Sequence, residues 1–436
     1  MSISAAMKFD RARFVRSADW LAVAVAASLP WSTSATGVFL VIWLLALLPT
    51  LQLDALRREL TTLAGGLPVI LVALAALGML WSEVSWIAAF GGLKPFAKFL
   101  VIPLLFVQFR KSDRGLIVLG AFFASCVVLL AFSLAHAMWP ELVESKSYGV
   151  PVKDYIAQSG EFVLCAFAAA YMAFDFFRAG RRKAAIAWLL LSSVFLFDVL
   201  YVVSGRTAFV TIPVLLMMFG VRQFSWKGAI GVLAVGIVSG AIVWMSSPYL
   251  RERVTNLAYE VEAYQVNKDF TSAGLRLDFW KKSLGFIAEA PMTGHGTGSI
   301  RHMFEKAAVG QEGLWALPFD NPHNQVLAVG IQLGFLGISL LLAMWLSHLL
   351  LFHQPGLIAW IGTLVVVQNI VSSLFNSHLF DFTQGWLYVF GVGVAGGVIL
   401  RGRAGTRQEL PPEQPPVPEP ETIDSMQGGA QPQRPI

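Results

Sequence analysis

The chain has 436 residues, of which 56% are hydrophobic and only 14% are charged, and its formal net charge is +5. Soluble domains carry about a quarter of charged residues, so this composition excludes a soluble enzyme or a soluble binding module. The small positive charge gives no reason to expect a nucleic-acid partner. The two cysteines, Cys126 and Cys165, lie inside apolar stretches, where they are expected to pack as small apolar residues.

A series of apolar stretches follows along the chain, most of them near the roughly 20 residues that a bilayer-spanning helix requires. The first and the eighth are short or interrupted by proline, Pro30 and Pro213. The predicted spans cover residues 17–31, 35–51, 62–80, 87–109, 115–139, 155–177, 184–203, 208–221, 227–246, 325–350, 356–375 and 382–400. We therefore predict an all-α polytopic membrane protein of about 12 transmembrane helices. The first is expected to be a retained helix rather than a cleaved signal peptide.

The positive charge of the connecting segments alternates along the chain. Lys and Arg gather in every second segment, whereas the short loops between carry only Lys146, Lys153 and Arg206. Because such a bias in short loops sets membrane orientation, both termini are predicted to be cytoplasmic. The long loop 247–324 then lies outside the cytoplasm, since long translocated loops escape this rule.

These features divide the chain into four parts. Residues 1–246 are predicted to hold transmembrane helices 1–9, and residues 325–400 to hold helices 10–12. Residues 247–324 form the outward loop. Residues 401–436 are rich in Pro, Gln and Glu, cannot bury enough apolar surface to fold, and are predicted to be a disordered cytoplasmic tail.

The outward loop contains two segments with helical spacing of apolar residues. The first runs over about residues 250–264, and the second over 275–290, where Leu277, Trp280, Leu284 and Ile287 are predicted to form one stripe. Amphipathic helices on a membrane face lie in the membrane–water interface or cover a cavity.

Three glycines at a spacing of two, Gly294, Gly296 and Gly298, follow the second segment. A phosphate-binding loop would require a following Lys-Ser/Thr or a flanking strand, and neither is present. A turn between helices is the favoured interpretation, because glycine is the default residue of tight turns.

Ionisable residues near the membrane are candidates for function. Arg206 lies in the outward turn Ser204-Gly205-Arg206-Thr207, and arginine suits multidentate phosphate recognition. Lys94 and Lys98 share one face of a predicted span, where they either snorkel outward or line a cavity. Asp198, inside another span, is a candidate to neutralise one of these cations. The histidines do not show the spacing of a metal site, and no metal is expected.

Several of these features, in this order, resemble the O-antigen ligase family and its relatives, the O-antigen polymerases and bacterial protein O-oligosaccharyltransferases. The resemblance covers roughly residues 190–400. The matching features are Ser204-Gly205-Arg206-Thr207, the long loop with Arg276 and Trp280, Pro291-x-x-Gly294-x-Gly296-x-Gly298, and Pro322-His323-Asn324 at the start of the next span. Relatives often carry an asparagine near the outer start of the sixth span, where this chain has Gln158 and Glu161.

The resemblance implies glycan transfer on the periplasmic side of the bacterial inner membrane, without a cofactor or metal. The donor is a glycan linked to undecaprenyl diphosphate, and in ligases the acceptor is a sugar hydroxyl of the lipid A–core. Arg206 and Arg276 would hold the diphosphate and stabilise its charge as it leaves. His323 would orient or deprotonate the acceptor hydroxyl. Lys94, Lys98, Trp280 and Asn324 are expected to contact substrate.

Three alternative functions remain open: two enzymes that use the same donor, and a transporter that performs no chemistry. A polymerase and a protein O-oligosaccharyltransferase use the same donor with a different acceptor, and the dominant single loop favours the ligase. A transporter of lipid-linked glycan would also suit many spans with intramembrane charges. However, its cations should line a path through the bilayer rather than gather at one face.

Overall fold

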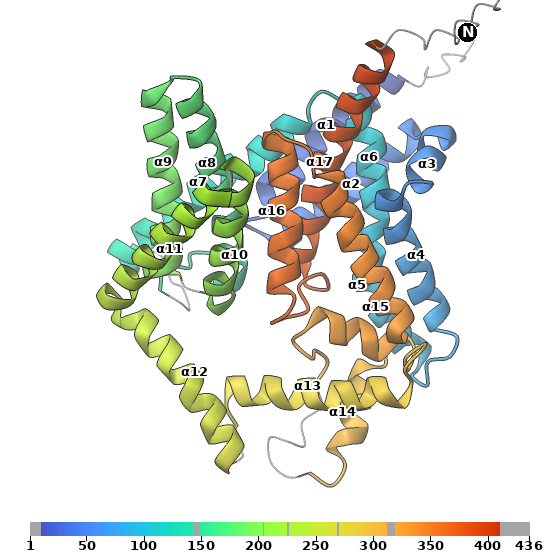
Figure 1. Cartoon of the computed structure of the whole chain (residues 1–436). Coiled ribbons are helices and arrows are strands. Elements are labelled where there is room, and N and C mark those ends of the chain that lie inside the picture. The colour runs from blue at the N-terminus through green and yellow to red at the C-terminus, as the bar shows by residue number, and fades with distance from the viewer. Residues whose placement is uncertain are drawn as a thin grey trace, which may run out of the picture.

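The computed structural model of the chain describes residues 10–142, 148–203, 205–224, 226–267, 270–311 and 319–409. Within these ranges the regular structure is helical, and none of these residues forms a β-strand. The prediction of an all-α fold is confirmed (Figure 1).

The helices fall into three consecutive groups along the chain. The first group, up to the long outward loop, consists of α1 (Arg11–Ser28), α2 (Thr33–Leu47), η1 (Leu48–Thr50), α3 (Leu53–Leu60), α4 (Leu63–Gly78), α5 (Trp86–Ala97), η2 (Lys98–Leu100), α6 (Val101–Lys111), α7 (Gly115–Met138), η3 (Pro140–Leu142), α8 (Tyr155–Arg178), α9 (Arg182–Phe197), η4 (Asp198–Val202), α10 (Arg206–Gln223) and α11 (Trp226–Ser246). The second group consists of α12 (Pro248–Asn267), α13 (Ser272–Glu289) and α14 (Ile300–Ala308), and the third of α15 (Gln325–Leu351), α16 (Leu357–Ser372) and α17 (Phe382–Glu409).

Many of these helices are long and apolar enough to cross a membrane. The described residues contain eight such stretches, or nine if α3 and α4, which meet at 87°, form one broken span. The predicted spans 17–31, 208–221 and 356–375 coincide with α1, α10 and α16, which are not among these stretches. The chain is therefore a multi-pass membrane protein, and the count of 12 spans stays a prediction.

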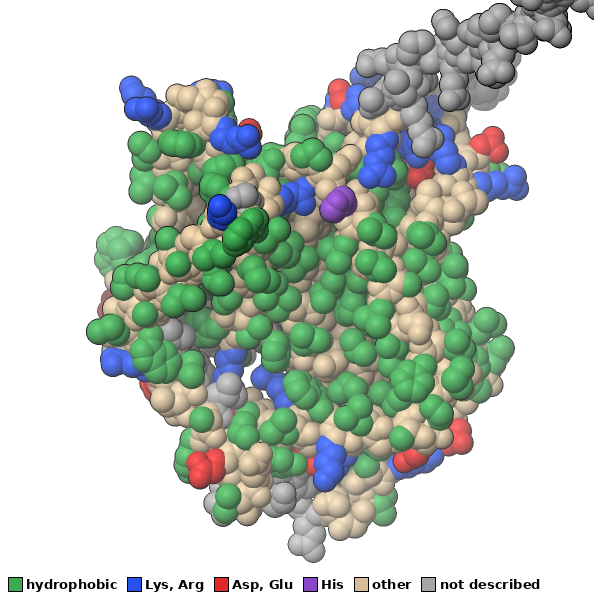
Figure 2. Space-filling model, viewed as in Figure 1, with side chains coloured by type: hydrophobic (Ala, Val, Ile, Leu, Met, Phe, Trp, Pro, Cys, Tyr) green, Lys and Arg blue, Asp and Glu red, His purple; other side chains and the backbone are tan. Residues whose placement is uncertain are grey.

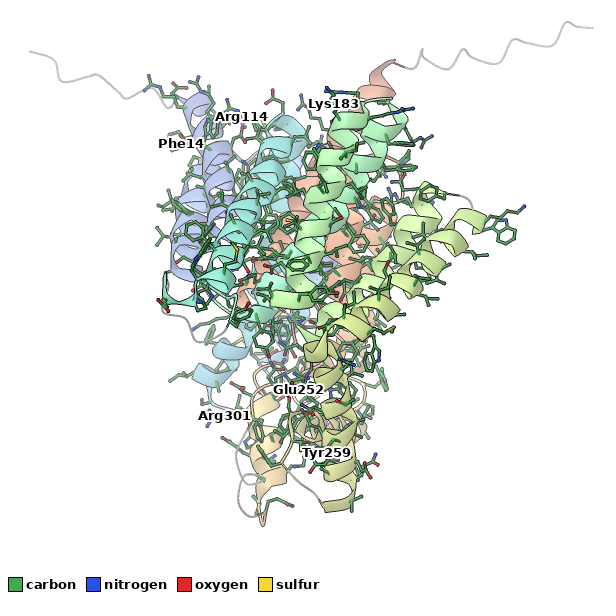
Figure 3. All side chains as sticks on the ribbon, turned by 90° about the vertical axis from the view of Figure 1, so that its left-hand side faces the viewer. Phe14, Arg114, Lys183, Glu252, Tyr259 and Arg301 are labelled. Atoms are coloured by element: carbon green, nitrogen blue, oxygen red, sulfur yellow. The ribbon has the colours of Figure 1, made fainter. Side chains whose placement is uncertain are left out.

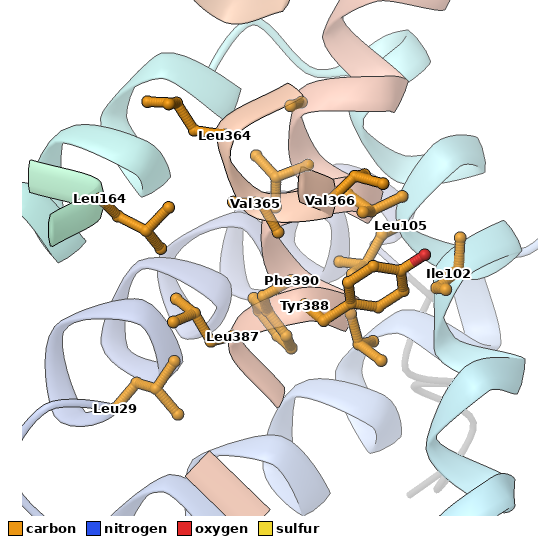
Figure 4. Close-up of a cluster of buried hydrophobic side chains, with 14 of the residues drawn as sticks. Leu29, Ile102, Leu105, Leu164, Leu364, Val365, Val366, Leu387, Tyr388 and Phe390 are labelled. Carbon is orange, nitrogen blue, oxygen red and sulfur yellow. The ribbon is translucent and has the colours of Figure 1, made fainter. Parts of the chain in front are cut away.

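The core of the bundle forms around α17. Its glycines let α6 approach closely, since a Cβ at Gly393 would lie 2.4 Å from the Leu105 side chain, and one at Gly396 would lie 2.3 Å from the Phe106 ring. Small residues at helix contacts are typical of membrane bundles, where close packing replaces the hydrophobic effect. Beside these contacts, Phe390 of α17 packs with apolar side chains from α1, α8 and α16 (Figure 4).

Helix α15 is broken at Gly334. This residue has φ 60° and ψ −156°, a conformation that is essentially restricted to glycine. The break separates a short first half, which begins just after His323, from a longer second half that spans the bundle (Figure 1).

The glycine-rich turn between α13 and α14 fills this break. The freed carbonyls of Ile331 and Gln332 accept hydrogen bonds from the N–H groups of His295 (2.8 Å) and Gly296 (2.9 Å). On the other side of the break, Pro291 O accepts from Phe335 N at 2.7 Å, and Met292 O from Leu336 N at 3.2 Å. The turn thus replaces the missing helical hydrogen bonds, which satisfies backbone groups that would otherwise be unpaired.

The three glycines of this turn are required by both conformation and space. Gly294, Gly296 and Gly298 all have positive φ, and a Cβ on each would lie 2.6 Å or less from a neighbouring backbone atom. The prediction of a turn between helices is confirmed, and its glycines lie against α4, α5 and α15.

The two predicted amphipathic helices of the outward loop exist as α12 and α13. The predicted stripe of α13 is confirmed at Ile287, which is buried, but it is wrong at Leu284, which is 61% exposed, whereas Phe279, Ser283 and Phe286 are buried. The reason is that the aromatic cluster of Phe279, Phe286 and Phe304 on α14 determines which face of α13 packs inward.

The two ends of the bundle carry different parts of the chain. Figure 3 places Phe14, Arg114 and Lys183 at one end, and Glu252, Tyr259 and Arg301 at the other. This separation agrees with the predicted inward and outward segments. Helix α17 continues to Glu409, nine residues into the predicted tail 401–436, and the rest of that tail lies outside the described residues.

We predict that Gly334→Ala destabilises the protein. A Cβ at this position would lie 2.5 Å from the Met292 backbone, and the conformation itself costs about 1–3 kcal/mol for a residue with a side chain. Thermal unfolding of the purified protein should show a clear loss of Tm. Gly310→Ala is the matched control, because Gly310 also has positive φ but nothing lies within 4 Å of its added Cβ. Equal effects of the two substitutions would contradict the role of the inserted turn.

Candidate functional site

Arg206 begins α10, at the end of the bundle that carries α12 and α13. Its preceding residue is Gly205, where a Cβ would lie 2.4 Å from Ser159 Oγ, so a larger residue would displace this hydroxyl of α8. Ser204 of the predicted turn lies outside the described residues. The guanidinium of Arg206 makes a two-pronged ion pair with Glu260 of α12, at 2.9 Å and 3.3 Å. Its position at a helix N-terminus adds to the local positive potential.

Arg276 lies in the second turn of α13 and faces the same carboxylate. Burial lowers the pKa of the Arg276 guanidinium, the charge of Arg206 lowers it further, and Tyr155 and Glu260 raise it. The two guanidinium groups therefore repel each other, and Glu260, which pairs with Arg206, attracts both.

Glu260 also contacts the N-terminus of α13, because its second carboxylate oxygen accepts from Ala273 N at 2.9 Å. Burial alone would raise the pKa of the Glu260 carboxyl, but the hydrogen bonds from Arg206 and Ala273 hold it below its ordinary value. The ionised carboxylate thus lies at the N-terminus of α13 and beside the Arg206 guanidinium. This is the environment that favours an anion.

His323 is held in an unusual backbone conformation just before α15. Its φ is +52°, which is uncommon for a residue with a side chain, and its N–H donates to Asn321 Oδ1 at 2.8 Å. The imidazole stacks on Phe279 of α13 with ring centres 6.1 Å apart. Strained backbone of this kind is concentrated at functional sites.

The neighbours of His323 determine its tautomer. His323 Nδ1 lies 2.9 Å from Asn376 Oδ1, and Asn376 Nδ2 donates to the Asp381 carboxylate at 3.1 Å. Because a carboxylate can only accept, the amide of Asn376 must direct its NH₂ group to Asp381 and its oxygen to His323. His323 therefore carries its proton on Nδ1, which leaves the Nε2 lone pair available to accept a proton.

Burial lowers the pKa of His323, the hydrogen bond to Asn376 raises it, and the charge of Arg276 lowers it, so that the net shift is downward. This direction favours the neutral imidazole. The charge of Arg276 acts on His323, and the charge of Arg206 acts on Arg276. The structure brings the three predicted catalytic residues together at one end of the bundle. Figure 2 shows a hollow bounded below by α13, with Lys and Arg side chains inside.

The predicted substrate contacts occupy different environments. Lys98 is buried, and its ammonium donates to the carbonyls of Phe380 (3.3 Å) and Asp381 (2.8 Å), beneath the loop that carries Asn376. Lys94, one turn earlier, is exposed, and no contact joins it to the arginines within the described part of the chain. Asp198 accepts from Ser133 instead, so Asp381 is the carboxylate beside Lys98.

Asn324 and Trp280 flank His323 and Arg276. Asn324 caps α15 through its Oδ1, which accepts from Val326 N and Leu327 N, and its Nδ2 donates to Leu374 O at 3.1 Å. Its side chain is thus engaged structurally. Trp280, one turn after Arg276, has a buried indole N–H without a hydrogen-bond partner among the described residues. A buried donor of this kind is a candidate to bind an anionic substrate oxygen.

The sequence analysis missed the groups that support the three predicted catalytic residues. Glu260 was one of many charged residues on an amphipathic helix, and nothing in its spacing distinguishes it. Asn376 and Asp381 lie in the segment 373–381, which connects two spans and also carries Ser377 and His378. The high proportion of polar residues in this short connection was the sequence signal that could have indicated functional residues. Among the described residues, no three His, Cys, Asp or Glu side chains gather as metal ligands would.

Residues 191–342 match the sequence model of the O-antigen ligase family. The matched region contains Arg206, Arg276, Trp280, His323 and Asn324, whereas the 373–381 segment lies beyond the match.

A protein of Haemophilus influenzae (strain ATCC 51907 / DSM 11121 / KW20 / Rd), described as uncharacterised, is 27% identical to this chain over 190 residues. The alignment covers 42% of this chain and 47% of the relative, so the chain spans about half the length of the curated relative that it matches.

We predict opposite pKa shifts at His323 for two substitutions. Asn376→Ala should lower its pKa further, because it removes the hydrogen bond that raises it. Arg276→Gln should raise it, because it removes a nearby like charge. NMR titration of protein with ¹⁵N-labelled histidine measures both the pKa and the tautomer. Lys282→Gln, on α13 but paired with Asp278, is the control and should leave the pKa unchanged. A wild-type pKa above 6.5, or shifts of the same sign, would contradict this geometry.

Proposed function

We propose that this protein is an O-antigen ligase of lipopolysaccharide biosynthesis. In this proposal it transfers a glycan from undecaprenyl diphosphate to a sugar hydroxyl of the lipid A–core. The observation that carries the proposal is the convergence of Arg206, Arg276 and His323 at the end of the bundle that holds α12 and α13. The match of residues 191–342 to the O-antigen ligase family supports the same reaction.

The location follows from the same proposal. Residues 1–246 and 325–400 form the membrane part in the bacterial inner membrane, with both termini cytoplasmic. Residues 247–324 face the periplasm and hold the reaction. The segregation of Arg114 and Lys183 at the opposite end of the bundle supports this orientation under the positive-inside rule (Figure 3).

The donor diphosphate binds to the guanidinium groups of Arg206 and Arg276, beside the Glu260 carboxylate. Fork-shaped guanidinium groups match phosphate oxygens in two-pronged contacts. Because they are held in place before the reaction, they stabilise the charge that develops on the leaving diphosphate without further rearrangement. The unpaired indole N–H of Trp280 is a further donor for this group.

His323 Nε2 takes the proton of the acceptor hydroxyl. The hydroxyl oxygen then forms a bond to the anomeric carbon of the donor glycan, while the bond from that carbon to the diphosphate oxygen breaks and its electron pair leaves with the diphosphate. Attack opposite the leaving group inverts the anomeric centre. Asn376 and Asp381 hold the imidazole in the tautomer that this step requires. The step uses no metal ion.

We predict that Arg206→Ala and Arg276→Ala each reduce transfer by about 100-fold or more, because each removes one preorganised contact to the leaving group. His323→Ala should cost about 100-fold or more through the loss of the general base. The measurement is transfer from undecaprenyl diphosphate–linked glycan to lipid A–core by purified protein in EDTA.

Arg301→Ala is the matched control, because Arg301 is an exposed cation of α14 that pairs only with Glu305 among the described residues. Wild-type transfer by all three variants would refute the site. Loss of wild-type activity in EDTA, with recovery on addition of a divalent cation, would refute the metal-independent step. Longer donor-linked chains in place of glycosylated lipid A–core would identify a polymerase, and movement of donor without any new bond would identify a transporter.

We also predict the pH dependence of transfer. The neutral form of His323 is the base, so kcat/KM should rise with pH and level off above the pKa of the free enzyme. Because burial and the charge of Arg276 lower that pKa, the acid limb should lie at lower pH than for an ordinary histidine. His323→Gln should show low activity without this limb. An acid limb above pH 7 in the wild type, or an unchanged limb in His323→Gln, would assign the base to another group.

A further inference from the structure

A second cavity lies at the opposite end of the bundle from the arginine cluster. It has a volume of about 260 Å³ and lies between α1, the end of α6 and the η1 turn. An ordered water needs only about 10–15 Å³ by the same kind of measure, so the space is much larger than a site for one bridging water. Phe14 of α1 marks this end of the molecule in Figure 3.

Two cations line the rim of this cavity. The Arg11 guanidinium donates to Thr50 O at 2.7 Å, and the Lys111 ammonium donates to Gln52 Oε1. Both side chains are thus fixed against the segment between α2 and α3. Lys111 also experiences the repulsive charges of Arg11 and Arg58. The rim therefore carries two positive charges whose positions are set by these hydrogen bonds.

The buried carboxylates at this end are bound to other groups. Glu59 pairs with Arg110 at 2.8 Å and with Arg58 at 3.1 Å. Asp19 accepts hydrogen bonds from Gln108 Nε2 at 2.9 Å and from Ser112 Oγ at 2.8 Å. Neither carboxylate neutralises Arg11 or Lys111, so an external anion would gain from binding here.

Below the rim the cavity becomes apolar. Its wall is formed by the side chains of Val15, Ala18, Leu47, Leu51 and Val107. An apolar wall of this kind accepts the hydrocarbon chain of a lipid whose headgroup lies at the rim.

We propose that this cavity binds the phosphate headgroup of an anionic phospholipid at its rim, with the first part of an acyl chain of that lipid against the apolar wall. Free phosphate would use the two cations but not the apolar wall, whereas a phospholipid matches both. A zwitterionic lipid would place its own cation beside Arg11 and Lys111. The site is independent of the proposed transfer reaction, since it lies at the other end of the bundle.

The test is native mass spectrometry of the full-length purified protein with phosphatidylglycerol or phosphatidylcholine of identical acyl chains. Wild type should retain phosphatidylglycerol preferentially. Each cation near an anionic headgroup contributes about fivefold in affinity, so Arg11→Gln with Lys111→Gln should weaken phosphatidylglycerol binding about thirtyfold. Leu51→Trp, which keeps both cations but fills the cavity, should also weaken it.

Lys183→Gln is the matched control, because Lys183 is an exposed cation at the same end of the bundle and does not line the cavity (Figure 3). An unchanged Tm in each variant shows that the bundle is intact. Equal retention of the two lipids, or an equal loss in Lys183→Gln, would overturn the proposal. Displacement of the lipid by inorganic phosphate would also overturn it and identify a simple phosphate site.

Discussion

The insertion of the 291–298 turn into the break of α15 is the constraint on which the proposed site depends. The turn supplies the hydrogen bonds that α15 loses at Gly334, and so joins α13 to the membrane bundle. Because Arg276 lies on α13 and His323 immediately precedes α15, this one junction determines the position of both residues. Arg206 comes from a third helix, α10, and Glu260 connects it to the N-terminus of α13.

The electrostatics of the cluster follow from this arrangement. Burial and mutual repulsion make two adjacent guanidinium groups costly, and Glu260 offsets part of that cost in the absence of substrate. Burial lowers the pKa of His323, and the charge of Arg276 lowers it further, which favours the form that accepts a proton. In the proposed ligase, anion binding and base catalysis are therefore two consequences of one charge distribution.

The sequence predicted the elements whose signals are local. Apolar runs predicted the helices, loop charges predicted which segments share an end of the bundle, and glycine spacing predicted the turn between α13 and α14. It missed the features that depend on distant partners. The buried face of α13 is determined by Phe304 on another helix, the break at Gly334 is stabilised by residues about 40 positions earlier, and the tautomer of His323 depends on Asn376 and Asp381. Such long-range contacts leave no periodic pattern.

The most direct test of the central claim is a ³¹P NMR titration of purified protein with undecaprenyl diphosphate in detergent micelles. The account predicts that wild type shifts both phosphorus resonances, and that Arg206→Gln and Arg276→Gln each weaken binding strongly, because both guanidinium groups contact the diphosphate. Lys282→Gln, which removes a cation of α13 that pairs with Asp278, should bind as wild type does. Wild-type affinity in both arginine variants would contradict the claim that these residues form the diphosphate site.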